Sequence, residues 1–492
     1  MATLAYCWLA ASSLCHYRCF ITTAQGTGVF TMSSDTPDKQ QTSSSQPDST
    51  PTEGNAKKLG VIGATFLIIS SLAGSGVIAL PQQLAFTGSI TLVSFILVTL
   101  GALFLTLVYV RAGERFDDPS PTALATTVSP IIGAKCGFFY VYGNLISNVS
   151  ILIAGLGYIA MFIPELNDPI VLGCTVIALI WLFVVLSLRG VGIIAQVVSI
   201  TVTLLLIAVV LTSILGWLEF SPAQFRENWN VSGKGDGSAI MAGFAILIFS
   251  YVGVESVATN AEQIENPQKV VPVATIVGFL VVAVFYILST TVMEGMFTAK
   301  VIQEAPASFA LSMEKIFHSS YVGQIVSLVM AIACIASFMV WGLNSVSAAK
   351  TSADNGFLPK AYSYTNRYGI ASKGLVINGV IMTAVELVLM LMGSDIAEAF
   401  NISVTISVLL LLFPYFWSGV ALLKLDHLEK KTSRSNIAIV ALSSLFIISA
   451  FASANYDELM MVIAMVMIVP GIYAILMNIK IVNVDTVFHH TN

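Results

Sequence analysis

Ala73-Gly74-Ser75-Gly76 interrupts an apolar run over residues 61–82, and Ser250-Tyr251-Val252-Gly253, with Glu255 next to it, interrupts a second run over residues 239–263. These runs are the first and the sixth of the apolar segments along the chain. Two interrupted helices in corresponding places of two halves are typical of an inverted-repeat transporter that binds its substrate near the bilayer midplane. Close helix packing is the alternative, but it favours small-xxx-small spacing over a contiguous Gly-Ser-Gly.

The composition around these interruptions indicates a membrane protein. Of 492 residues, 56% are hydrophobic and 10% are charged, and the mean hydropathy is +0.87. Such a chain lacks the mixed-charge surface of a water-soluble domain. The net charge of −5 and the lack of a Lys/Arg cluster with interleaved aromatic residues exclude a nucleic-acid partner and leave lipid as the solvent.

Hydrophobic runs bounded by Gly, Pro and charged residues predict about twelve transmembrane helices and no strands. The expected spans are Val61–Gln82, Ser89–Val110, Cys136–Pro164, Pro169–Leu188, Ile193–Leu218, Ala239–Gln263, Val271–Met296, Gly323–Lys350, Leu375–Met392, Glu398–Leu423, Ile437–Ala454 and Leu459–Ile481. With the N-terminus inside, only Arg226, Lys234, Lys300 and Lys315 fall in external loops. The positive-inside rule therefore predicts that both termini are cytoplasmic.

The ends of the chain have a different composition. Ser33–Thr52 is almost free of apolar residues, so we expect residues 1–56 to form a disordered cytoplasmic tail, with Met32 as the true start. Residues 57–482 form the predicted transporter domain, and residues 483–492 a short cytoplasmic tail. The six cysteines are scattered without metal-ligand spacing, which predicts no metal site and no cofactor.

The interruptions themselves suggest a chemistry. An unwound segment leaves the first amides of the following half-helix free, so Ser75, Gly76 and Val77 can present N–H groups to an α-carboxylate. The carbonyls near Phe249 and Ser250 lie at the negative end of the other half-helix, where an α-ammonium is stabilised. Glu255 would cost ~2.5–3.5 kcal/mol at the bilayer centre, so it either faces a cavity or is hydrogen-bonded, for example to the broken backbone.

Several motifs in one order and spacing resemble the amino acid, polyamine and organocation superfamily, and within it the basic amino acid/polyamine antiporters. They are GSGVIALP (Gly74–Pro81), DPSP (Asp118–Pro121), GLGY (Gly155–Tyr158), FSYVGVES (Phe249–Ser256), ENPQKVVPVAT (Glu265–Thr275) and the stretch from Trp341 to DNGFLPK at Lys360. The resemblance covers Lys58 to about Lys480. It implies an all-α, leucine-transporter-like 5+5 inverted repeat with broken helices 1 and 6.

The resemblance also implies roles for particular residues. Trp341 matches the tryptophan that stacks on the substrate, Asn148 an amide near its distal end, and Tyr140 and Glu255 gating or coupling positions. The predicted substrate-binding residues are Leu72, Ala73, Ser75, Gly76, Asn144, Asn148, Phe249, Ser250, Trp341 and Thr405. Two departures leave the substrate open. Thr122–Ala125 replaces the usual Gly-Gly-x-Tyr stretch after DPSP, and Gly143-Asn144 replaces the small pair of the arginine/agmatine exchangers.

The resulting hypothesis is an antiporter that exchanges an external cationic amino acid (arginine, lysine or ornithine) for its internal decarboxylated amine. The fifth span lacks the lysine with which proton-coupled relatives carry protons, which favours exchange. The alternatives are an ion-coupled symporter with Ser345 and Ser347 as sodium ligands, and an amino acid sensor on the same fold. A membrane enzyme is not expected, because the spans hold no nucleophile/His pair. A bacterial inner membrane is the expected location, and a homodimer is left open.

Overall fold

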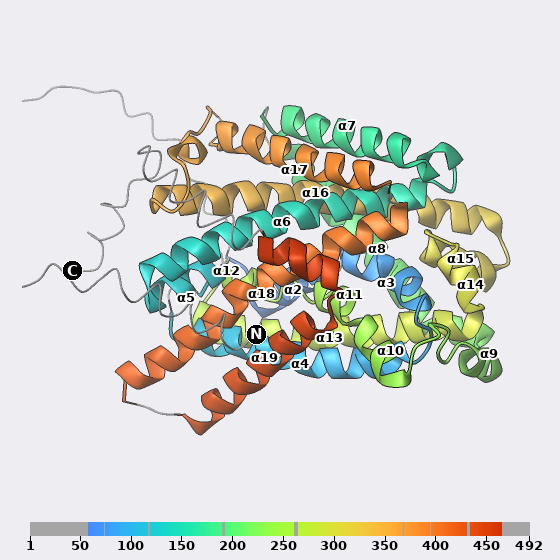
Figure 1. The fold of residues 1–492 in the computed structure, drawn as a ribbon, viewed down its shortest axis with the longest axis horizontal. Helices are drawn as coiled ribbons and strands as arrows, with labels where there is room; N and C mark the ends of the chain where they lie inside the picture. Colours follow the sequence, from blue (N-terminus) through green and yellow to red (C-terminus); the bar gives the residue numbers. More distant parts are fainter. Residues whose placement is uncertain are drawn as a thin grey trace, which may run out of the picture. The chain divides into compact units, whose positions relative to one another are not determined.

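The computed structural model describes residues 58–72, 74–116, 119–188, 192–259, 264–367, 369–393, 395–430 and 433–464, with backbone only at 75, 192–199 and 259. The predicted tail over residues 1–56, the end of the last predicted span and the C-terminal tail lie outside these ranges. The described part of the transporter domain is helical, with two isolated β-bridges, and Figure 1 shows its long helices running roughly alongside one another.

The long helices match the predicted spans closely. They are α4 (Thr91–Gly113), α6 (Pro130–Ile159), α7 (Pro169–Leu188), α8 (Gly192–Leu215), α13 (Pro267–Met296), α16 (Ser320–Asp354), α17 (Ser372–Met392), α18 (Ile396–Leu428) and α19 (Arg434–Ser453). Nine described helices are long and apolar enough to cross a membrane, and one bent pair makes up to ten. The all-α, multi-pass membrane architecture is confirmed, while the count of twelve and the inverted repeat stay predictions.

Both predicted interruptions occur. The first span is divided into α2 (Val61–Leu72) and α3 (Ser75–Ala85), and a bend of 41° separates the two parts. The sixth span is divided into α10 (Asp236–Ala242), α11 (Phe244–Phe249) and α12 (Ser256–Thr259). Residues 250–255 between α11 and α12 form turns instead of helix. The division at Gly243, between α10 and α11, was not predicted.

Local sequence explains where the helices begin. The Asp395 carboxylate accepts a hydrogen bond from the Glu398 N–H and caps α18, and Ser433 caps α19 in the same way. Ser120 caps α5 (Pro121–Val128), whose first residue is a proline. The predicted starts at Cys136, Gly323 and Glu398 were late, because the first turn of each helix precedes the apolar run from which the start was read.

The short helices gather at the ends of this bundle. At one end lie α9 (Pro222–Glu227), α14 (Ala299–Gln303) and α15 (Ser308–Phe317), and at the other lie α5 and the last turns of α18 (Figure 1). Between the two ends, α6 is the most buried of the spans and packs against α16 and α18. The two broken spans lie beside this central group, so the interruptions are deep inside the protein.

Candidate substrate site at the two breaks

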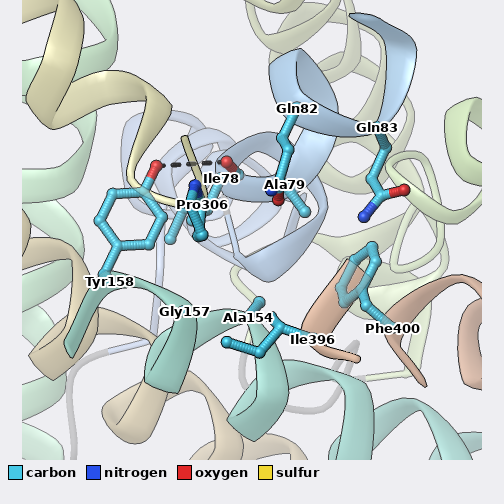
Figure 2. A pocket seen from close by; sticks show the side chains of 10 residues that line it. All are labelled: Ile78, Ala79, Gln82, Gln83, Ala154, Gly157, Tyr158, Pro306, Ile396 and Phe400. Atoms are coloured by element: carbon cyan, nitrogen blue, oxygen red, sulfur yellow. Dashed lines mark hydrogen bonds between the residues drawn. The ribbon is translucent and has the colours of Figure 1, made fainter. Parts of the chain in front are cut away.

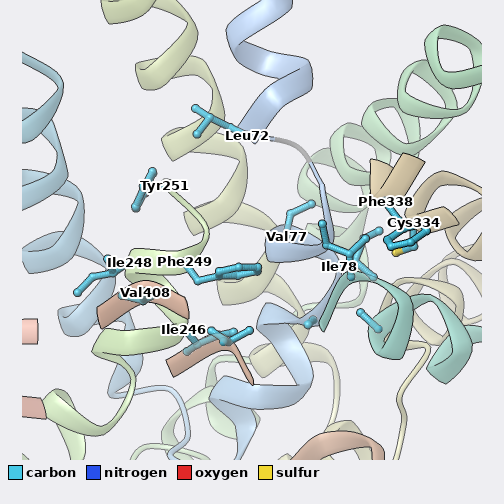
Figure 3. Close-up of a cluster of buried hydrophobic side chains, with 14 of the residues drawn as sticks. Leu72, Val77, Ile78, Ile246, Ile248, Phe249, Tyr251, Cys334, Phe338 and Val408 are labelled. Carbon is cyan, nitrogen blue, oxygen red and sulfur yellow. The ribbon is translucent and has the colours of Figure 1, made fainter. Parts of the chain in front are cut away.

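The two breaks meet at Gly76 and Ser250. A Cβ atom on Gly76 would lie 2.9 Å from the Ser250 Cα, so a larger side chain cannot fit without moving the backbone. Figure 3 shows Leu72 and Val77 on the two sides of the first break, with Phe249 at the end of α11 drawn nearer to Val77 than to Leu72. Segments separated by about 170 residues in the chain are thus brought into direct contact.

The first break leaves a helix N-terminus without a cap. Gly74 precedes α3 and provides no side-chain hydrogen bond to it. The carbonyl of Leu72 accepts hydrogen bonds from the Gly74 N–H (2.8 Å) and the Tyr286 hydroxyl (2.5 Å), which satisfies that carbonyl at the end of α2. The first N–H groups of α3 lack intrahelical partners by geometry, and they form a positive end suited to a carboxylate. Ala73 lies outside the described residues.

The second break presents carbonyl groups. The Phe249 carbonyl accepts one hydrogen bond from the Val252 N–H (3.1 Å), so one of its two lone pairs remains. The Ser250 hydroxyl donates to the Ile246 carbonyl (3.0 Å) and is buried. The Phe249 ring packs edge-on against Phe400 of α18 with centroids 6.1 Å apart. The Phe249 carbonyl therefore keeps capacity to accept a further hydrogen bond at the end of α11.

Trp341 of α16 lies over the unwound segment of the sixth span. A Cβ on Gly253 would be 3.3 Å from Cζ2 of the Trp341 indole, and Gly253 has a φ of +110°, which side-chain-bearing residues rarely adopt. The Trp341 side chain is half-buried and lies more than three helical turns from the end of α16 at Asp354. It is too deep for an interfacial aromatic belt.

Asn148 of α6 is linked to the same turn of α16. Its amide Nδ2 donates to the Ser345 hydroxyl (3.3 Å), and that hydroxyl donates to the Trp341 carbonyl (2.8 Å). Asn148 is fully buried, and its Oδ1 has no hydrogen-bond partner among the described residues. A buried polar atom without a partner is uncommon and calls for a ligand or a water molecule. Asn148 thus offers a free acceptor close to Trp341.

Glu255 is held by its own break and by α6. Its Oε1 accepts a hydrogen bond from the Tyr140 hydroxyl (3.2 Å), and its Oε2 accepts one from the Gly253 N–H (3.2 Å). Only 1% of the residue is exposed. One hydrogen bond therefore links the two residues predicted to gate, Tyr140 and Glu255. The other is the hydrogen bond to the broken backbone that the sequence analysis gave as a way to satisfy this carboxylate.

Two tyrosines around Glu255 were missed in the sequence. Tyr109 of α4 and Tyr415 of α18 both lie close enough to interact with the Glu255 carboxylate, and their rings pack edge-on with centroids 5.8 Å apart. The Tyr109 hydroxyl also hydrogen-bonds Ser418 (3.2 Å). Only Tyr415, in the middle of α18, carried a signal, because a phenol inside an apolar span needs a polar partner, and the sequence does not say which partner. One carboxylate thus accepts a hydrogen bond from Tyr140 and lies near two further tyrosines on other helices.

Not every predicted residue joins this group. Thr405 lies close enough to interact with the Glu458 carboxylate, at the start of the helical residues 456–464. The amide of Asn144 donates to the Tyr140 carbonyl of its own helix (2.7 Å). Glu386, a second buried carboxylate, lies where α17 packs against Gly173 of α7. The geometry therefore gathers Gly76, Asn148, Phe249, Ser250, Glu255 and Trp341, whereas Thr405 lies near Glu458.

The residues considered for sodium do not converge. The Ser345 hydroxyl is buried and already engaged by Asn148 and Trp341, whereas Ser347, two residues further along α16, is exposed. Residues two apart on a helix point to different faces. Among the described residues, no group of three or more His, Cys, Asp or Glu side chains is placed to hold a metal ion.

Comparison with known proteins agrees with this architecture. Residues 59–476 match the family model described as amino acid permease. The chain is 34% identical over 409 residues to the cadaverine/lysine antiporter of Escherichia coli strain K12, which covers 82% of this chain and 92% of that protein. It is 30% identical over 374 residues to the putrescine transporter PotE of the same strain, covering 75% of this chain and 84% of the relative. A putrescine transporter PotE of Haemophilus influenzae is 28% identical over 415 residues, covering 82% and 94%. The chain belongs to the amino acid permease family.

Proposed function

We propose that this protein is an antiporter that takes up a cationic amino acid and releases its decarboxylated amine. The observation that carries the proposal is the buried, unpartnered Oδ1 of Asn148 beside the Trp341 turn. A guanidinium or alkylammonium group would donate to this oxygen and lie against the indole, a contact worth about 2 kcal/mol when desolvated. The free N–H groups of α3 and the carbonyls at Phe249 and Ser250 would bind the α-carboxylate and the α-ammonium.

The relatives support this class of substrate. One is named a cadaverine/lysine antiporter and two are named putrescine transporters. These names include two amines and one cationic amino acid. An amine shares the distal ammonium of its parent amino acid and lacks the carboxylate. The Asn148 and Trp341 end of the site would therefore serve both substrates, while the α3 terminus would distinguish them.

The driving force is proposed to be the two substrate gradients. The α8 span carries no charged side chain along its length. The resemblance noted above places a proton-carrying lysine there in proton-coupled relatives, so its absence favours exchange. Amine production by decarboxylation consumes a proton, and export of the amine then removes positive charge from the cell.

Glu255 and Tyr140 are proposed as the gate and coupling pair on the cytoplasmic side of the substrate. The Tyr140 hydroxyl and the Gly253 N–H hold the carboxylate on α6 and on the unwound segment at once. Movement of α6 relative to the break would have to separate the Tyr140 hydroxyl from the Glu255 carboxylate. The carboxylate then becomes available to a passing cation, which is why a charge at this position would speed exchange.

The orientation follows from charge. In the described bundle, Arg115, Lys350, Lys360, Lys373 and Lys424 lie at or beyond the helix ends nearest α5, which we propose to be cytoplasmic. Both termini would then lie inside a bacterial inner membrane. Association as a homodimer is part of the same proposal, through membrane-facing helices.

Exchange in proteoliposomes tests the proposal. Vesicles loaded with agmatine, cadaverine or putrescine should take up labelled arginine, lysine or ornithine, with one pair fastest, and empty vesicles should take up little. Reversing the loading should give the opposite flux. Uptake into empty vesicles that depends on a sodium or proton gradient, without stimulation by any internal amine, would instead establish a symporter.

A further inference from the structure

A small pocket lies along α3, beyond the first turn of that helix. Figure 2 shows its lining, in which Gln82 and Gln83 reach out from α3 and the Gln83 amide points toward Phe400. The other lining residues are Ile78, Ala79, Ala154, Gly157, Tyr158, Pro306 and Ile396. The pocket is bounded by α3, α6, α18 and the segment before α15, and so separates the breaks from the end of the bundle that carries α14.

Gln82 ties α3 to α14. Its Nε2 donates to the Gln303 carbonyl (3.0 Å), and Nε2 of Gln303 donates back to the Ala85 carbonyl (2.8 Å). The side chains of Gln82 and Gln303 thus form reciprocal hydrogen bonds that link the end of α3 to the end of α14. Gln82 is 7% exposed, so its hydrogen bonds replace water almost completely.

Gln83 ties α3 to the first turns of α18. Its Nε2 donates to the Ala397 carbonyl (3.3 Å), and its Oε1 accepts from Nδ2 of Asn401 (2.5 Å). Neighbouring glutamines thus bind two different elements, α14 and α18. Tyr158 of α6 adds a third link, because its hydroxyl donates to the Ile78 carbonyl (3.3 Å) and accepts from the Phe309 N–H (3.4 Å).

These side chains connect different elements instead of satisfying their own helices. Uncharged amides suit a reversible contact, because they exchange a protein partner for water at a net cost of only about 0.5–1.5 kcal/mol per hydrogen bond.

We propose that Gln82, Gln83, Gln303 and Asn401 form an external latch that closes the path from outside to the substrate site. The latch holds the half-helix α3, whose N-terminus is the proposed carboxylate site, against α14 and α18. Its residues position α3 and do not touch the substrate. When the path opens, the hydrogen bonds among these four amides, and those to the Ala85, Ala397 and Gln303 carbonyls, must be replaced by hydrogen bonds to water.

Access to the pocket wall tests the latch. Ala154 lines the pocket and is 7% exposed, so Ala154→Cys places a thiol behind the latch. Intact cells that carry this reporter are treated with a membrane-impermeant cationic thiol reagent, and cells with the natural cysteines alone give the background. Adding Gln82→Ala and Gln83→Ala together should increase the rate of modification roughly tenfold, and Asn401→Ala alone roughly threefold, from the hydrogen bonds removed.

A matched control separates the latch from general loosening. Asn378 of α17 is also a buried amide, 1% exposed, but neither its nitrogen nor its oxygen has a partner among the described residues. Asn378→Ala should leave the modification rate of the introduced thiol unchanged. Equal rates in the latch variants and in Asn378→Ala, each with normal yield and a monodisperse elution profile, would overturn the proposal. If the double variant fails to fold, Asn401→Ala decides by the same criterion. The assay needs no substrate, so its result is independent of the exchange reaction proposed above.

Discussion

The two breaks differ in what they leave at the centre of the protein. The first break, between α2 and α3, contributes an uncapped helix start and the Leu72 carbonyl, which Tyr286 already satisfies. The break at residues 250–255 is longer and contributes a carboxylate, which Tyr140 and the Gly253 N–H hold in place. One break thus contributes free backbone N–H groups, and the other contributes an ionisable side chain. Under the proposed function, the first break would bind the α-carboxylate, and the second would bind the α-ammonium through its carbonyls and gate through Glu255.

The largest effect should follow from separating the breaks. Gly76→Val would push a side chain into the Ser250 backbone, which is 2.9 Å from an ideal Cβ. Overpacking of this kind moves backbone, so we expect exchange to fall by roughly 100-fold and substrate binding to fall with it. Initial rates in proteoliposomes and equilibrium binding measure the two quantities.

Gly60 provides the control for that substitution. A Cβ on Gly60 meets nothing within 4 Å, so Gly60→Val, one residue before α2, should keep exchange within about twofold of the unmodified protein. Equal loss in both variants would mean that the contact between the breaks has no special role.

A smaller and more selective effect is expected at the second break. Glu255→Gln keeps the shape and most hydrogen bonds of the side chain but removes its charge, so substrate should still bind while exchange slows by roughly tenfold and loses part of its pH dependence. Glu255→Ala should be slower still, because it leaves the Tyr140 hydroxyl and the Gly253 N–H unpaired. Labelled exchange across pH, beside equilibrium binding, makes the distinction. An unchanged rate and pH profile in Glu255→Gln would reduce this residue to a structural group.

Trp341 should affect affinity more than turnover. Trp341→Leu removes the indole that lies over Gly253, and the lost cation–π contact of ~1–2 kcal/mol should raise the substrate Kd by roughly tenfold. Trp341→Phe retains an aromatic face and should lose less. Binding titrations on the purified protein decide this point, and unchanged affinity in a well-folded Trp341→Leu protein would remove the stacking role.

The sequence was sufficient for features that are local in the chain. Gly-Ser-Gly at 74–76 and the polar stretch from Ser250 to Glu255 mark both breaks, because glycine and polar groups are unfavourable inside an apolar helix unless the structure uses them. The tyrosines around Glu255 could not be assigned in this way. Tyr109, Tyr140 and Tyr415 lie on three helices, and only the packing of α4, α6 and α18 brings them to one carboxylate.

The sequence also could not predict which side of each central helix faces the breaks. In α18 nearly every residue from Ser403 to Leu412 is buried, so no apolar stripe shows which side faces the breaks. Resemblance alone then placed Thr405 in the site. In the structure Thr405 lies near Glu458, beside a cluster in which Ile406 and Leu409 pack against Val462.

Thr405 therefore gives the smallest and most discriminating test. If Thr405 serves only the contact with Glu458, Thr405→Val should leave substrate affinity within about twofold and lower stability by no more than ~1 kcal/mol. Glu458→Gln should be equally silent in binding, because it acts on the same contact. Asn148→Ala is the matched comparison, since it removes the free acceptor beside Trp341 and should weaken substrate binding roughly tenfold. Binding isotherms and thermal unfolding of the three variants separate the effects. A Thr405→Val protein that loses affinity as Asn148→Ala does would return Thr405 to the substrate site and would show that α18 contributes to recognition together with the two breaks.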